Sequence, residues 1–263
     1  MRVTAVFASR LPEFEIPGVM TWDERRANVE HAMSLGMPRL TVRDEKPGPL
    51  TIACYGPSLR DTYRDMRSPV LSVSGAHDFL IERRVIPEYH VECDPRAHKA
   101  KMLSQPNEHT EYLIASCCHP DVFRALDGCK VFLWHLDNGP ESRLWALHHD
   151  PLGLSVCGGS TVGLRSFEIA HILGYRSMDV HGMDCSFDGF QQWAGKHSGE
   201  RKPVQYVAIA GSNRRYATTP LMVQQAREAV TFWRTHDVPM KFRGSGLCQA
   251  MWKHSKDGRW AST

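Results

Sequence analysis

The sequence predicts an α/β protein built around a mainly parallel sheet with helices on both faces. From residue 50 onward, short runs rich in β-branched residues alternate with stretches of helical pattern, which is the order of elements in a parallel sheet. Glycines and acidic residues also gather where the strand-like runs end. Ligands of such folds bind outside the carboxyl ends of the strands, so we expect a functional site at that edge.

The first two thirds of the chain alternate strands with helices. Strands are expected at 50–56, 69–75, 88–94, 111–117, 130–136 and 154–157. Helices are expected between them at 57–67, 76–85 and 120–128. The last of these is well delimited, because Pro120 suits the first turn of a helix and Gly128 suits the position just after its end.

The last third continues the pattern with one exception, a hairpin. The helix expected at 162–174 is apolar on all sides and should therefore be central. A hairpin is expected at 204–219, with its turn at Gly211, Ser212 and Asn213. The other elements expected here are a strand at 176–185, a helix at 219–236 capped by Thr219, and a last strand at 239–244, which leads through a glycine-rich turn into 247–252.

The domain organisation follows from where this alternation begins. Residues 1–47 contain one amphipathic helix, at 22–36, and are expected to form an N-terminal cap segment. Residues 48–263 are expected to form one α/β domain. A chain of this length, with 42% hydrophobic residues, can bury a sizeable core in a single domain.

Charge, apolar runs and cysteines narrow the class of protein. The formal net charge of +3 is not the basic excess of a nucleic-acid-binding protein. No apolar run approaches the roughly 20 residues of a membrane span, and Pro12 interrupts the start before a secretory signal could form. We therefore expect a cytoplasmic protein. The cysteine-rich stretch at 117–129 lacks the paired spacing of a structural zinc site.

The short sequence Gly-Gly-Ser-Thr at 158–161 lies between an expected strand and the central helix. One interpretation is structural: Ser160 or Thr161 caps the helix, and Gly158 and Gly159 form a tight turn. The other is a phosphate or carboxylate site, in which free N–H groups at the helix start bind the anion. The motif alone leaves both interpretations open.

Other expected strands also end in small or acidic residues. In chain order these are Gly56, Pro57 and Ser58; Ser74 and Gly75; Asp94; Asp137, Asn138 and Gly139; and His181, Gly182, Met183 and Asp184. Loops of small residues offer N–H groups to phosphate oxygens, and carboxylates suit Mg²⁺. The pattern favours a phosphorylated ligand with a divalent metal, although the dinucleotide and P-loop glycine motifs are absent.

Four blocks of sequence resemble a known family. They read IACYGPSL, VSGAHDFLIERRVIPEYHVECDPR, GGSTVGLRSFEIAHILGYRSMDVHGMDCSF and RRYATTPLM. In this order they resemble the archaeal-type 6-hydroxymethylpterin diphosphokinase (MptE-like) family. That family shares its Rossmann-like core with motility-associated glycosyltransferases and, more distantly, with bacterial sialyltransferases. The resemblance covers roughly residues 48–250, and the block from Gly158 to Asp184 is its most specific part.

The resemblance implies a Rossmann-like fold and a nucleotide-dependent transferase. The first reading is a diphosphokinase that moves diphosphate from ATP, with Mg²⁺, to the hydroxymethyl group of a pterin-like small-molecule acceptor. The alternative is a glycosyltransferase that uses a CMP-activated sugar. A second alternative, from another class, is a nucleotide-binding module without catalytic activity.

The resemblance also implies roles for residues at matching positions. His181 and Asp184 would be catalytic, and Asp94 and Asp184 would hold the metal. Nucleotide or phosphate contacts would come from Gly56, Pro57, Ser58, Gly158, Gly159, Ser160 and Thr161. Further contacts are expected, apart from the resemblance, from Ser74, Gly75 and Asn138 at other strand ends and from His197 in the stretch at 186–203. Ser74 and Gly75 stand where relatives are expected to carry an asparagine, which weakens the case for base or ribose contacts there.

Several of these residues have a structural alternative. Asp94 and Asp184 each suit a turn after a strand, and His181 suits a buried core position. The glycine-containing stretch at 186–203, which includes His197, is either a surface loop or a lid over the site.

Overall fold

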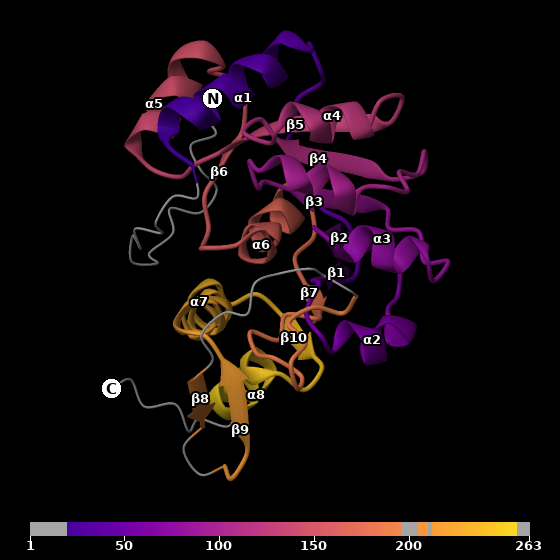
Figure 1. Ribbon diagram of the computed structural model, residues 1–263, viewed down its shortest axis with the longest axis vertical. Coiled ribbons are helices and arrows are strands. Elements are labelled where there is room, and N and C mark those ends of the chain that lie inside the picture. Colours follow the sequence, from indigo (N-terminus) through magenta and orange to yellow (C-terminus); the bar gives the residue numbers. More distant parts are fainter. Residues whose placement is uncertain (1–19, 196–204, 210–211, 257–263) are drawn as a thin grey trace.

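The computed structural model describes residues 20–195, 205–209 and 212–256. Within them, eight parallel strands form one sheet surrounded by helices, and a separate two-stranded hairpin lies beside it (Figure 1). This confirms the predicted α/β, Rossmann-like architecture and the predicted hairpin. Every helix in these residues is too short or too polar to cross a bilayer.

The strand order shows where the chain reverses direction across the sheet. The order is β10-β7-β1-β2-β3-β4-β5-β6, so the chain runs outward from β1 to β6 and then returns to the other side of β1. The switch point therefore lies between β1 and β7, where folds of this kind bind ligands. The strands are β1 (Leu50–Ala53), β2 (Val70–Val73), β3 (Tyr89–Glu92), β4 (Glu111–Ala115), β5 (Lys130–Leu136), β6 (Ser155–Val156), β7 (Met178–His181), β8 (Gln205–Ala208), β9 (Arg215–Thr218) and β10 (Met240–Arg243).

The helices follow most of the expected ranges, but several are shorter. The region expected as a helix at 57–67 splits into α2 and a 3₁₀ turn, and α5 lies where we predicted no element. The helices are α1 (Trp22–Ser34), α2 (Leu59–Thr62), η1 (Tyr63–Asp65), α3 (Ala76–Ile81), η2 (Ala97–Met102), α4 (Pro120–Ala125), α5 (Pro140–His149), α6 (Val162–Ile172), α7 (Pro220–His236) and α8 (Leu247–Lys256).

The central helix is α6, as its composition predicts. Nine of its eleven residues are buried, and it contacts β2, β3, β6 and α7. It is the crossover from β6 at the sheet edge to β7 beside β1, which explains why no face of it is polar. Its first turn therefore reaches the carboxyl edge of the sheet.

The described part of the N-terminal segment packs onto this core. Val29 and Ala32 of α1 are buried in the main hydrophobic cluster. The amide of Asn28 donates hydrogen bonds to the carbonyl oxygens of Pro95 (3.2 Å) and Cys117 (3.0 Å). Helix α1 is thus tied to the loops that follow β3 and β4, at the edge where we expect the site.

Candidate functional site

The loops after β1 and β7 pack against each other at the switch point. The Gly56 N–H donates to the carbonyl oxygen of Gly182 (2.7 Å), and a Cβ at position 56 would lie only 2.3 Å from that oxygen. Gly182 has a φ of +66°, and a Cβ at this position would lie equally close to the carbonyl oxygen of Cys54. Close backbone packing therefore requires both glycines, whether or not a ligand binds there.

Asp184 lies under the loop that contains Pro57 and opens α2. It is 3% exposed, and its Oδ2 accepts a hydrogen bond from the Ser58 N–H (2.8 Å). Its Oδ1 is buried and has no hydrogen-bond partner among the described residues, and burial raises the pKa of the carboxyl group. In this position the Asp184 carboxylate anchors the loop that contains Ser58.

His181, the other predicted catalytic residue, is the last residue of β7. It is 1% exposed, and neither ring nitrogen has a hydrogen-bond partner within the described part of the chain. The nearest carboxylate oxygen is Asp179 Oδ1 at 3.9 Å. Burial lowers the pKa of the imidazole, so the ring is neutral at neutral pH.

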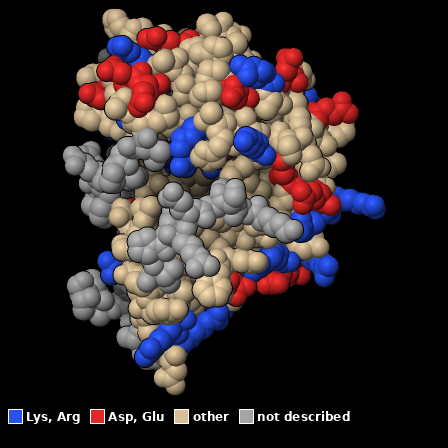
Figure 2. All heavy atoms as spheres, viewed as in Figure 1, with Lys and Arg blue, Asp and Glu red and all other residues tan. Residues whose placement is uncertain are grey.

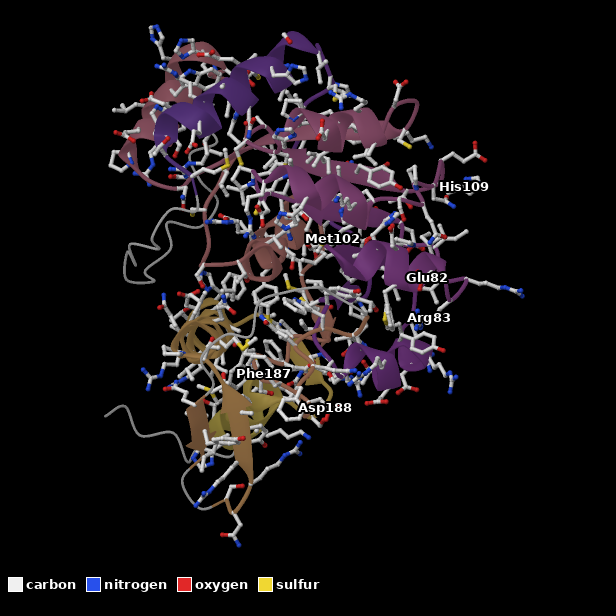
Figure 3. All side chains as sticks on the ribbon, viewed as in Figure 1. Glu82, Arg83, Met102, His109, Phe187 and Asp188 are labelled. Atoms are coloured by element: carbon white, nitrogen blue, oxygen red, sulfur yellow. The ribbon has the colours of Figure 1, made fainter. Side chains whose placement is uncertain are left out.

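Ser74 and Asp94 belong to a second cluster, at the ends of β2 and β3. Lys99 donates a hydrogen bond to Ser74 Oγ (2.8 Å) and lies 3.5 Å from Asp94 Oδ2. Burial opposes ionisation of Asp94, but hydrogen bonds from Arg96 and the charge of Lys99 outweigh it and lower the pKa. Met102, labelled in Figure 3, closes the cluster with its sulfur 3.7 Å from Ser74 Oγ. Gly75 contacts the ring of Tyr55.

The two predicted metal ligands, Asp94 and Asp184, lie in different clusters. Strands β3 and β7 are separated by β1 and β2, which places their ends about 14 Å apart at the usual strand spacing. Each carboxylate is already engaged by its own neighbours. No group of three or more metal-binding side chains occurs among residues 20–195, 205–209 and 212–256. These residues therefore do not fit a shared Mg²⁺ site.

The 158–161 loop is both a helix cap and an anion site, but the anion belongs to the protein. Thr161 caps α6 by accepting a hydrogen bond from the Leu164 N–H (3.3 Å). The N–H and hydroxyl of Ser160 both donate to Oε2 of Glu228 on α7, at 2.9 and 2.7 Å. Gly158 and Gly159 have φ values of +102° and +87°, which only glycine adopts readily.

The start of α6 lies close to the switch point. A Cβ at Gly163 would be 3.0 Å from the Met183 side chain and 3.2 Å from the sulfur of Cys54. The structure thus brings the 158–161 loop, the end of β1 and the end of β7 together at one edge. The part of the predicted lid that is described, 186–195, reaches the same edge, where the Ala194 N–H donates to the Tyr55 carbonyl oxygen (3.0 Å).

Two charged residues of α6 were not predicted as site residues. Arg165 is 6% exposed, and within the described part of the chain its guanidinium group forms no hydrogen bond or ion pair. Its charge acts on the Cys93 thiol, which follows β3, and on the Glu168 carboxyl group. The signal in the sequence was present, since charges are rare in a helix that is otherwise apolar all round.

Glu168 lies one helical turn after Arg165 and is 4% exposed. Its Oε1 accepts a weak hydrogen bond from the Cys157 thiol (3.9 Å), and its Oε2 is buried with no hydrogen-bond partner in the part of the chain that the structure describes. Burial raises the pKa of this carboxyl group to about 7. Glu168 can therefore take up or release a proton near neutral pH.

On the face shown in Figure 2, lysine and arginine side chains border a recess.

The remaining predicted contacts are Asn138 and His197. Asn138 follows β5, next to the end of β6, and its N–H donates to Ser142 Oγ (3.0 Å). His197 lies outside the described residues.

Comparisons with known proteins agree with this architecture. The chain is similar to the MAf glycosyltransferase of Magnetospirillum magneticum AMB-1, with a TM-score of 0.62 and 16% identity. The match covers 84% of this chain and 36% of the glycosyltransferase, so the chain spans just over a third of that protein. At this identity the likeness concerns the fold. No curated protein matches the chain.

A family model gives the more specific result. The model for 6-hydroxymethylpterin diphosphokinase MptE-like proteins matches residues 27–189, which is more than half of the chain. The matched range includes α1 from residue 27 onward, the strands from β1 to β7 and the whole 158–184 block. The family is named for a diphosphokinase, which is a transferase. The chain therefore belongs to the 6-hydroxymethylpterin diphosphokinase MptE-like family.

Proposed function

We propose that this protein is a nucleotide-dependent transferase, most like a diphosphokinase that moves diphosphate from ATP to the hydroxymethyl group of a pterin-like acceptor. The family supports this reaction class. The donor phosphates would bind at the carboxyl edge of the sheet, beside the first turn of α6.

The observation that carries the proposal is the guanidinium group of Arg165. A buried charge without a counter-ion is costly, and such groups in native proteins are paired or bind a charged ligand. No described carboxylate lies within ion-pair distance of Arg165, although its side chain is almost wholly buried, and the Glu168 carboxyl group feels its charge only from a longer distance. A phosphate group is the anion best matched to a planar guanidinium, because two parallel hydrogen bonds can form.

The reaction needs a base as well as an anion site. In diphosphate transfer the acceptor hydroxyl oxygen bonds to the β-phosphorus of ATP, the bond to the α-phosphate oxygen breaks, and AMP leaves. The hydroxyl proton must pass to a base, and Glu168 has the proton affinity for this step at neutral pH. Mg²⁺ would accompany the ATP phosphates, but we assign it no protein ligand, because Asp94 and Asp184 do not share a site.

Glycosyl transfer from a CMP-activated sugar is the second candidate. One observation favours it, namely the fold shared with a glycosyltransferase. The two candidate enzymes differ in the nucleotide that they bind. The third interpretation, a nucleotide-binding module without catalytic activity, differs from both because it would turn over no substrate.

The test is a panel of thermal shifts with ATP, CTP, CMP and GTP, each with and without Mg²⁺. A ligand at a hundredfold excess over its Kd adds about 2.7 kcal/mol to the free energy of unfolding. We expect ATP to stabilise the protein and Arg165→Gln to reduce that shift. Stabilisation by CMP or CTP alone would favour the glycosyltransferase. Binding without any turnover of 6-hydroxymethylpterin would favour the non-catalytic module, and no shift with any nucleotide would overturn the proposal.

A further inference from the structure

A cleft with a volume of about 370 Å³ lies between α1 and the start of α5. Trp22 and Arg25 of α1 form one wall, and residues 138–142 form the other. A second, narrower pocket, which we call the extension of the cleft, shares Trp22, Arg25 and Ser142 with it and is also lined by Ser116, Cys117 and Trp145. Ligand pockets have volumes of about 300–1,000 Å³, so this cleft suits a molecule of one or two rings and is small for a whole nucleotide.

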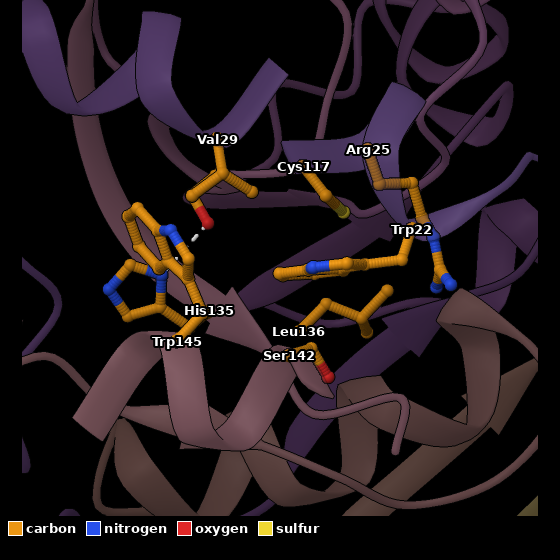
Figure 4. A pocket seen from close by; sticks show the side chains of 9 residues that line it. Trp22, Arg25, Val29, Cys117, His135, Leu136, Ser142 and Trp145 are labelled. Carbon is orange, nitrogen blue, oxygen red and sulfur yellow. Dashed lines mark hydrogen bonds between the residues drawn. The ribbon is translucent and has the colours of Figure 1, made fainter. Parts of the chain in front are cut away.

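The walls of the cleft and its extension are aromatic and fixed in position. Figure 4 shows the indole of Trp22 between Cys117 and Leu136, with the guanidinium group of Arg25 beside it. Trp145 is held from behind by stacking on His149, with ring centroids 4.5 Å apart. Trp22 is half-buried, so part of its indole remains available to a ligand. Such surfaces contact flat rings in offset or edge-to-face geometry.

The polar groups of the cleft include one cation and one anion, neither of them paired. The guanidinium group of Arg25 contacts only the Thr21 carbonyl (3.4 Å) and the Trp22 ring, within the described part of the chain. The Glu141 carboxylate has no described partner. A ring edge with a carbonyl beside adjacent N–H groups complements both, because the carbonyl accepts from Arg25 and the N–H groups donate to Glu141.

The cleft adjoins the region of Arg165. The thiol of Cys117, at its inner wall, donates to the Cys93 carbonyl (3.3 Å), and the charge of Arg165 acts on the Cys93 thiol. On the other side, the Asp137 N–H donates to the Val156 carbonyl (2.9 Å), so Asn138 lies next to the 158–161 loop. The cleft therefore lies at the same edge of the sheet as Arg165 and Glu168, and the charge of Asp137, the residue before Asn138, acts on the Glu168 carboxyl group.

We infer that this cleft, formed by Trp22, Arg25 and Glu141, binds the acceptor as a small planar heteroaromatic ring with a carbonyl next to N–H donors. The identification of this ring as the acceptor rests on the proposed function. The ring site itself rests on the cleft. It also gives the N-terminal segment a role, since two of the three residues belong to α1.

The test uses 6-hydroxymethylpterin and its lumazine analogue, in which an oxygen replaces the amino group at ring position 2. Binding is measured by calorimetry on the native full-length protein, Trp22→Leu and Glu141→Gln. Tyr206→Leu removes another exposed aromatic ring, and Glu108→Gln removes another exposed carboxylate, so these two variants are matched controls.

We expect the native protein to bind the pterin more tightly than the lumazine. Trp22→Leu should weaken both ligands by about tenfold or more, the order expected for loss of one stacking partner. Glu141→Gln should weaken the pterin and remove its advantage over the lumazine. The two controls should leave both affinities unchanged.

Two results would overturn the inference: no pterin binding up to its solubility limit, or an unchanged pterin affinity in Trp22→Leu. If ATP binding is retained, an unchanged pterin affinity in Trp22→Leu would contradict the cleft and leave the proposed function standing, whereas the absence of pterin binding would count against both the cleft and the pterin-like acceptor. Pterin binding that depends on Trp22 in a protein that binds no nucleotide would support the ring site and contradict the proposed transferase function.

Discussion

The carboxylate of Glu228 on α7 accepts two hydrogen bonds from Ser160 at the start of α6, one from the N–H at 2.9 Å and one from the hydroxyl at 2.7 Å. These are the donors that the 158–161 loop would offer to a phosphate. The loop thus binds a carboxylate of the protein itself, which comes from a distant part of the sequence. Its glycines and hydroxyls are compatible with both interpretations that the sequence left open.

Glu228→Gln separates the two interpretations. If a donor phosphate reaches Ser160, removal of the competing negative charge should tighten ATP binding several-fold, while the weaker neutral hydrogen bonds lower the free energy of unfolding by about 1–2 kcal/mol. Calorimetry and denaturant unfolding measure the two effects. Gln224→Leu is the control, since it removes the hydrogen bond from Gln224 to Glu228 (2.9 Å) but keeps the carboxylate. A loss of stability without a change in affinity would make the loop purely structural.

Arg165→Gln tests the proposed phosphate contact. We expect the ATP dissociation constant to rise about 10- to 100-fold, because charged hydrogen bonds contribute about 1.5–3 kcal/mol each. The fold should persist, since the native guanidinium group has no described partner to lose. Arg165→Lys should recover part of the affinity through its point charge. Equal ATP affinity in all three proteins would remove Arg165 from the site.

Glu168→Gln should change the pH dependence of stability. Burial raises the pKa of Glu168 from 4.5 to about 7 in the folded protein. The folded state therefore holds the proton more tightly, and its stability falls as pH rises from the unfolded value through the folded one. The cost of ionisation reaches about 3 kcal/mol above this range.

The variant carries no such cost, so it should be more stable than the native protein at pH 8. The advantage should vanish below pH 4.5, the unfolded value of the Glu168 pKa. Thermal unfolding across this range measures it, with the exposed Glu108→Gln as the control. A constant difference between the two proteins at every pH would contradict the raised pKa.

Asp184→Asn tests whether this residue holds a metal. The Asn side chain can still accept the hydrogen bond from the Ser58 N–H, so the variant should fold. If Asp184 only supports the loop, the ratio of ATP affinities with and without Mg²⁺ should be the same in both proteins. A selective loss of Mg²⁺-dependent binding, measured by calorimetry, would restore the metal role predicted from the sequence.

The sequence predicted the fold well because local patterns determine each element. Short apolar runs form strands that are buried on both faces, and Thr161, Thr219 and Pro220 mark helix starts as expected. The element that was missed, α5, combines exposed Leu144 and Leu147 with half-buried Trp145 and so lacks a clear apolar face. Tertiary contacts define that helix more than its own periodicity does.

The site was harder to predict, because its main contacts join distant residues. No local pattern links Ser160 to Glu228, 68 positions away, or Ser58 to Asp184, 126 positions away. Glycines at strand ends indicated the right edge of the sheet, but at Gly56 and Gly159 the absent Cβ makes room for the protein itself. A Cβ at Gly159 would lie 2.7 Å from that of Leu164. Gly159→Val would therefore disrupt the fold and cannot report on ligand binding.

Helix α6 places three residues of different purpose at three strand ends: Gly163 at β1, Arg165 at β3 and Glu168 at β6. Insertion of one residue in its first turn would rotate the following residues by about 100° and misplace Arg165 and Glu168 together. The helix therefore has little freedom to vary in length, whereas the loops around it can lengthen without disturbing this alignment. Changes of specificity within this fold are thus expected in the loops and in α1, with the register of α6 kept constant.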